Sequence, residues 1–304
     1  SSDLFLQYFM RSIVEDLHGR TSGKAHFYGK FKALNIEGNL MTDASLKIGI
    51  LNTSFTVTDT IRLSTSGISF DNIRIADMEG HQGTMNGKLN FRHFRDLSYH
   101  FEFNVNNMLL MNTKENSDIN FYGKVYGTGN AMLIGNPQEL QVNAAVTTNR
   151  NTNFVYITNA TASAASNQFI KFVDKTPRRF VQDSINVMSE YDRLQQEMEE
   201  EESKTDIRLN LLIDATPDAT MKIIMDPIAG DYISGKGSGN IRTEFFNKGD
   251  VKMFGNYRIN QGIYKFSLQE VIRKDFIIKD GSSITFNGPP LDATLDIQDR
   301  KSVV

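Results

Sequence analysis

The five histidines and the carboxylates near them are the side chains of this sequence best suited to catalysis or metal binding. The histidines are His18, His26, His81, His93 and His100. His81 follows Asp77 and Glu79 closely, and imidazole and carboxylate groups are common metal ligands. His93 and His100 could meet across a hairpin, but no His-Glu-x-x-His spacing occurs. The simpler interpretation makes each histidine a half-exposed polar group on the wet face of a sheet, so no metal site is predicted.

Other catalytic motifs are also absent from the sequence. The glycine-rich segment 235–239 lacks the spacing of a phosphate-binding P-loop, and a strand-like pattern follows it instead of a helix. Ser238 does not lie in a Gly-x-Ser-x-Gly elbow. Asp292 and Asp296 alternate with an apolar row, which places them on a solvated outer face. We therefore predict neither an enzyme nor a cofactor.

Composition narrows the possible partners of this 304-residue chain. A net charge of -3 with both signs interspersed does not provide the basic surface that a nucleic acid requires. The chain has no cysteine, which excludes disulfides and thiolate metal sites. No run of 18 apolar residues and no signal-peptide pattern occurs, so we expect any targeting or membrane segment to lie outside this sequence.

The stretch from Lys248 to Asp299 has the period-two pattern of short β-strands. Val251, Met253, Tyr257 and Ile259 share one parity, with polar residues between them. Such alternation places apolar and polar side chains on opposite faces of a sheet. Turn signals at Asp280-Gly281 and at Gly288-Pro289-Pro290 separate the strands. This spacing predicts antiparallel hairpins or a ladder of strands.

Similar strands fill the sequence from Gly23 to Thr148. The clearest runs from Tyr99 to Val105, and Phe-Tyr-Gly-Lys occurs both at 27–30 and at 121–124. Glycines that recur within strands allow a long sheet to bend. We therefore predict an all-β chain whose antiparallel sheet curls over on itself. The residues alone do not decide whether the curled sheet is an open trough or is filled by its own side chains.

Two segments are expected to be helical. The first is an amphipathic helix from Asp3 to Leu17, which either packs over the end of the sheet or lies on a membrane surface. The second follows Thr176-Pro177, a helix-start signal, and has apolar residues at three- and four-residue steps up to Met198. Arginines near its start and Glu199–Glu202 at its end oppose the helix dipole. We predict a solvated insertion that frays into an acidic tail, with a plug or partner helix as the alternative.

The C-terminal stretch resembles the TamB C-terminal domain family of the translocation and assembly module, in the longer form of Bacteroidetes-type bacteria. The matching residues are Gly255, Tyr257, Ile259, Gly262, Tyr264, Phe266, Phe276–Ile278, Gly281, Ser282, Ile284–Phe286, Gly288, Pro290, Asp292, Ala293, Leu295, Asp296 and Ile297. The strands before them are similar to the same family, and the likeness is weakest between Pro177 and Lys204.

This resemblance implies a β-taco, which is a U-shaped curled sheet with a hydrophobic groove. Combined with the two helices expected from the residue pattern, it divides the chain into an amphipathic helix (1–19), a first part of the sheet (20–173), a helical and acidic insertion (174–205) and a C-terminal part of the sheet (206–304). The residues expected to line the groove are Phe101, Phe103, Val105, Leu209, Leu211, Ile213, Met221, Ile223, Met225, Met253, Tyr257, Ile259, Tyr264 and Phe266.

The implied function is carriage of phospholipid acyl chains between the inner and outer membranes by the family of bridge-type lipid transfer proteins. The implied location is the periplasm, with anchoring in the inner membrane by a segment outside this chain. One alternative is an assembly or chaperone role with an Omp85-type barrel similar to TamA, through a strand edge. The other is a structural β spacer.

Overall fold

The computed structural model describes residues 14–30, 33–92, 95–115, 120–158, 206–249, 251–268 and 272–298. Within these ranges every regular element is a β-strand, except for the 3₁₀ turn η1 (Pro290–Asp292). The strands are β1 (Val14–Lys30), β2 (Ala33–Ile48), β3 (Thr53–Ser64), β4 (Gly67–Asp77), β5 (Gln82–Arg92), β6 (Arg95–Thr113), β7 (Phe121–Asn136), β8 (Glu139–Thr148), β9 (Asn153–Ile157), β10 (Asp206–Ala215), β11 (Thr220–Asp226), β12 (Asp231–Phe246), β13 (Lys252–Leu268), β14 (Ile272–Ile278), β15 (Ser282–Gly288) and β16 (Thr294–Asp296).

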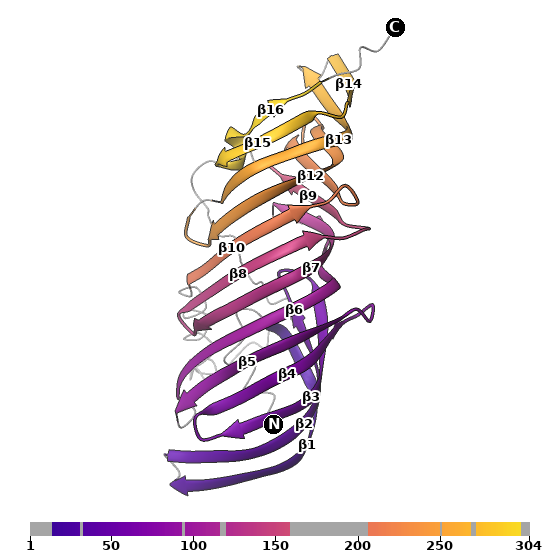
Figure 1. The fold of residues 1–304 in the computed structure, drawn as a ribbon. Coiled ribbons are helices and arrows are strands. Elements are labelled where there is room, and N and C mark those ends of the chain that lie inside the picture. Colours follow the sequence, from indigo (N-terminus) through magenta and orange to yellow (C-terminus); the bar gives the residue numbers. More distant parts are fainter. Residues whose placement is uncertain are drawn as a thin grey trace, which may run out of the picture.

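All of these strands belong to one curled sheet. Its order is β1-β2-β3-β4-β5-β6-β7-β8-β10-β12-β13-β15-β16, while β9, β11 and β14 pair beside this path. Figure 1 shows the strands stacked as a ladder from β1 (indigo) to β15 and β16 (yellow), with long strands that curve along their length. The prediction of an all-β chain with a curled sheet is confirmed.

Three of the long strands, β7, β12 and β13, change partner part-way along. Residues 127–136 of β7 pair with β8, whereas residues 121–124 of the same strand pair with β9. In the same way β12 divides between β10 and β11, and β13 divides between β15 and β14. The sheet is thereby folded into two walls. We call the line along which the walls meet the bend line.

Irregular backbone marks the bend line in the other strands. The pairing of β6 with β7 shifts register between Val105 and Met108. The pairing of β4 with β5 is irregular between Phe70 and Ile73, where Asn72 has a φ of 50°. In β12, a methyl group at Gly237 would lie 2.1 Å from the carbonyl oxygen of Arg258, so only glycine fits where the register shifts.

The sequence predicted a sheet that is antiparallel throughout. The structure contradicts this prediction at two strand pairs. β10 runs parallel to β8, and β11 runs parallel to β9. Parallel neighbours require a long connection, because the chain must return to the same end of the sheet before the second strand begins. Residues 159–205, between β9 and β10, supply that length. We call this double parallel junction the seam.

The described residues include only the C-terminal end of the first predicted helix and none of the second. Residues 14 to 19 are extended within β1, so the expected N-terminal helix does not reach Leu17. Backbone pairing decides this conformation, because β1 follows β2 residue by residue from Leu17 to Lys30. The rest of that helix (3–13) and the expected helical insertion (174–205) lie outside the described residues.

Two clusters of buried apolar side chains fill much of the inner face of the sheet. The first comes from β2 to β8 and is centred on Ile73, Leu89 and Met108. The second comes mainly from β12 to β15 and includes Ile259 and Ile284. The implied open U-shaped groove along the whole sheet is therefore wrong. Curling brings the large side chains of the inner face together, and close packing excludes water from both clusters.

Candidate functional site

Mainly apolar residues form rows across the inner face of the sheet, with Thr243, Gly129 and Gly255 among them. Strand register places them opposite one another from β6 to β13. One row is Phe103, Ala131, Ala144, Leu211, Thr243 and Met253, and the next is Val105, Gly129, Val146, Ile213, Ile241 and Gly255. A third row is Phe101, Leu133, Val142, Leu209 and Phe245. The other wall carries a row of Tyr156, Ile223, Ile233, Tyr264 and Phe276. The sheet thus presents one apolar surface that crosses the seam.

The predicted lining residues differ in burial. Phe101, Tyr257 and Ile259 are buried inside the two clusters, where they contribute to the core. The other eleven are only half-buried: Phe103, Val105, Leu209, Leu211, Ile213, Met221, Ile223, Met225, Met253, Tyr264 and Phe266. The assignment of these residues to a ligand groove stays a prediction.

Between the clusters lies a stretch of the inner face that neither cluster covers. It consists of Ala144 and Val146 on β8 and of Leu209, Leu211 and Ile213 on β10, and we call these five residues the inter-core face. All five are half-buried, and none of them packs in either cluster. Their side chains carry no polar atoms, so this surface can bind apolar ligands but offers nothing to orient a polar one. The sequence could have indicated the β8 pair, because Leu140, Val142, Ala144 and Val146 alternate with polar or small residues.

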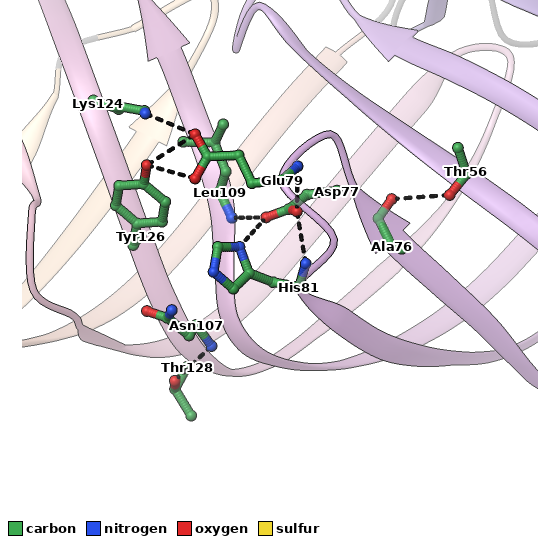
Figure 2. A network of polar contacts seen from close by, with 10 residues as sticks. All are labelled: Thr56, Ala76, Asp77, Glu79, His81, Asn107, Leu109, Lys124, Tyr126 and Thr128. Atoms are coloured by element: carbon green, nitrogen blue, oxygen red, sulfur yellow. Dashed lines mark hydrogen bonds and ion pairs between the residues drawn. The ribbon is translucent and has the colours of Figure 1, made fainter.

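A polar network ties the β4–β5 turn to β6 and β7 (Figure 2). The Asp77 carboxylate is fully buried, and it accepts hydrogen bonds from the amides of Leu109 (2.7 Å), Glu79 (2.9 Å) and His81 (2.9 Å). His81 Nδ1 lies 2.9 Å from the same carboxylate. Burial alone raises the pKa of Asp77, but these hydrogen bonds outweigh it and hold the pKa below its usual value.

Glu79 extends this network toward β7. Its carboxylate accepts hydrogen bonds from Lys124 Nζ (2.7 Å) and from the Tyr126 hydroxyl (2.8 Å). Hydrogen bonding to Lys124 lowers the pKa of Glu79, and the same bond raises the pKa of Lys124. The oxygens of Asp77 and Glu79 are thus occupied by protein donors. Their arrangement fits a locked turn and not the metal ligand set that the Asp77, Glu79 and His81 spacing suggests.

No chemical site emerges elsewhere in the described part of the chain. Within it, no group of three or more His, Asp or Glu residues is placed to hold a metal ion. The same residues include no helix long and apolar enough to cross a membrane. The inter-core face is therefore the surface that best matches a binding function.

Comparison with known families identifies the family of the chain. The family model of the TamB C-terminal domain matches residues 71–304. The chain belongs to this family. The match runs from within β4 to the C-terminus, so it includes the seam and the whole inter-core face. Searches of curated proteins and of solved structures returned no significant match. The TamB family is associated with the translocation and assembly module.

Proposed function

We propose that this TamB-family chain carries phospholipid acyl chains along its inner face, between the inner and outer membranes. The observation that carries the proposal is the inter-core face, an apolar surface that the protein's own side chains leave half-buried. Moving an acyl chain from water onto such a surface gains about 0.8 kcal/mol for each buried CH₂ group. The implied location is the periplasm, with an inner-membrane anchor outside this chain.

The two clusters limit where such a chain fits. The inter-core face lies between two packed cores. Leu89 in the first core is 2% exposed, and Ile259 in the second is 1% exposed. The packed clusters leave no space for an acyl chain, so we place the proposed contact on the half-buried face between them. Of the predicted lining residues, Leu209, Leu211 and Ile213 become the proposed contacts, and Ala144 and Val146 join them.

The test compares two neighbouring leucines on β10. Leu211 lies on the inter-core face, whereas Leu212 points to the opposite face and is 51% exposed. The purified chain is extracted with organic solvent and its lipids are counted by mass spectrometry. Leu211→Asp should lose most of the lipid and Leu212→Asp should keep it, with unchanged far-UV circular dichroism in both. Equal retention by the two folded variants would rule out the inter-core face, and lipid-free wild type would favour the structural spacer.

A second candidate function follows from the first strand. β1 is exposed over nearly its whole length, and within the described residues it pairs only with β2. From His18 to Lys30, the edge of β1 that faces away from β2 could pair with a strand of an Omp85-type barrel similar to TamA, the partner associated with this family. Proline at Ser22 or Lys24 should weaken site-specific crosslinking to such a barrel, while Leu211→Asp should leave it unchanged. Crosslinking that survives both prolines would exclude the β1 edge.

A further inference from the structure

The strands of this sheet form a nearly one-dimensional array. Apart from limited contacts of β6 with β3 and β4, the close contacts between strands join neighbours in the sheet order. In such arrays the stability is approximately a sum of local units and of the interfaces between neighbours. The array is therefore expected to come apart first at its weakest interface.

Between the two clusters, side-chain packing is sparsest where β8 meets β10 in the seam, which makes this junction the weakest interface between the two cores. Leu209, Leu211 and Ile213 lie opposite Val142, Ala144 and Val146 across it, and five of these six belong to neither buried cluster. From β2 to β8 and from β12 to β15, in contrast, the strand interfaces lie largely within one cluster or the other, as where Ile259, Ile278 and Ile284 pack together. Backbone pairing across the seam is parallel, which is slightly less stable per residue than antiparallel pairing.

Polar contacts hold the seam together at the bend line. The Thr216 amide donates to Thr148 Oγ1 (2.9 Å), and Thr216 Oγ1 donates to the Thr148 carbonyl (2.8 Å). On the outer face, Asn210 Nδ2 lies 2.9 Å from Asn143 Oδ1, a pair that water can replace because both residues are at the surface. These bonds fix the register of the seam, but individually they contribute only modestly to stability.

We propose that the seam divides the chain into two cooperative units, each of which opens while the other stays folded. The first unit is β2 to β8 around Ile73, and the second is β10 to β16 around Ile259. Opening of the second unit exposes the inter-core face without disturbing the first core. The division of the chain at the seam is a property of the fold and does not depend on the proposed function.

Native-state hydrogen exchange, read by mass spectrometry on the whole chain, tests the proposal. Ile73→Val and Ile259→Val each delete one methyl group from a fully buried side chain, one in each cluster. Ile259→Val should speed the exchange of β12 to β15 amides about fivefold and change that of β3 to β6 less than twofold. Ile73→Val should do the reverse. The β8 and β10 amides report the seam itself, and they should follow the unit to which each belongs.

The wild-type chain provides an independent readout that requires no substitution. As the denaturant concentration rises, the opening free energies of the amides within one unit should converge on a common line. The two units should give two such lines with different slopes. A single isotherm shared by Ile73 and Ile259 amides, or an equal acceleration of both units by either substitution, would overturn the proposal.

Discussion

The two buried clusters and the inter-core face are built from the same kind of strand but differ in what lies opposite their side chains. Leu89 on β5 is 2% exposed because residues from several strands converge on it in the first cluster. Leu211 on β10 has the same alternation in the sequence and the same inward orientation, yet it is only half-buried. Position within the curl, and not the local pattern, thus decides whether an apolar row becomes core or surface.

The largest expected effect tests this difference with one chemical change at two positions. Leu89→Ala should lower the free energy of unfolding by about 3 kcal/mol, since it leaves a cavity in a packed core. Leu211→Ala should cost about 1 kcal/mol or less, because its side chain is already in partial contact with solvent. Urea denaturation followed by circular dichroism measures both. Similar costs at the two positions would show that the inter-core face is core.

One buried tyrosine in each cluster reports, through its ionisation, how well that cluster excludes water. Burial raises the pKa of Tyr99 in the first cluster and of Tyr257 in the second, in both cases to about 12. In the unfolded chain the same tyrosines ionise near pH 10. Above pH 10 ionisation therefore favours the unfolded chain, so the free energy of unfolding is unchanged below pH 10 and falls as the pH rises toward 12. Two pKa units correspond to about 2–3 kcal/mol for each tyrosine.

Spectrophotometric titration at alkaline pH follows these two groups. Tyr99→Phe and Tyr257→Phe should each remove one late-titrating phenol and make stability less sensitive to pH between 10 and 12. If the second cluster were loosely packed, Tyr257 would ionise with the exposed tyrosines while Tyr99 would not. The pair therefore compares the two cores directly.

A smaller effect is expected at the locked turn beside the first cluster. Asp77→Asn replaces an acceptor oxygen with a donor facing the Leu109 amide, which leaves that buried donor unsatisfied at a cost of about 1–3 kcal/mol. Because the folded pKa of Asp77 lies below its unfolded value of 3.8, its contribution is present above that value and is lost as the pH falls through the folded pKa.

Acid unfolding of Asp77→Asn should therefore be shallower than that of the wild type. Asp71→Asn is the matched control on the same strand, since Asp71 is exposed. Acid titrations followed by circular dichroism distinguish the two variants. If the stability of Asp77→Asn fell with decreasing pH as steeply as that of the wild type, the Asp77 carboxylate would not be the group that makes stability depend on acid pH.

Sequence patterns predicted the strands and their faces well because alternation is a local property. The wet and dry faces of Tyr99 to Val105 and the turn at Asp280-Gly281 both occur as expected. Alternation does not reveal what an inward side chain meets, so Phe101 and Ile259 were expected in an open groove and lie instead in filled cores. Strand direction at the seam also escaped prediction, because it depends on where a distant segment returns.

The expected N-terminal helix was wrong for its last residues, 14 to 17. Their apolar groups have helical spacing, but pairing of β1 with β2 overrides that preference in this part of the chain. The locked turn was visible in the sequence only as the cluster of Asp77, Glu79 and His81, which has the residue types of a metal site. Its role became clear from the Leu109 amide on β6, a partner that is 32 residues away.

The smallest expected effect on stability, and the sharpest test of the inter-core face, comes from adding volume to it. Ala144 lies on this face opposite Leu211, whereas Ala145 points to the other face of β8. A packed core does not accept a phenylalanine in place of alanine without strain, which typically costs 1–3 kcal/mol or more. A half-buried surface should accept it at less than about 1 kcal/mol.

Ala144→Phe should therefore remain as stable as Ala145→Phe but retain less lipid, since the new ring occupies the surface proposed for the acyl chain. Strong destabilisation by Ala144→Phe alone would mean that the face is already filled, and equal lipid content in the two stable variants would place any lipid elsewhere on the molecule.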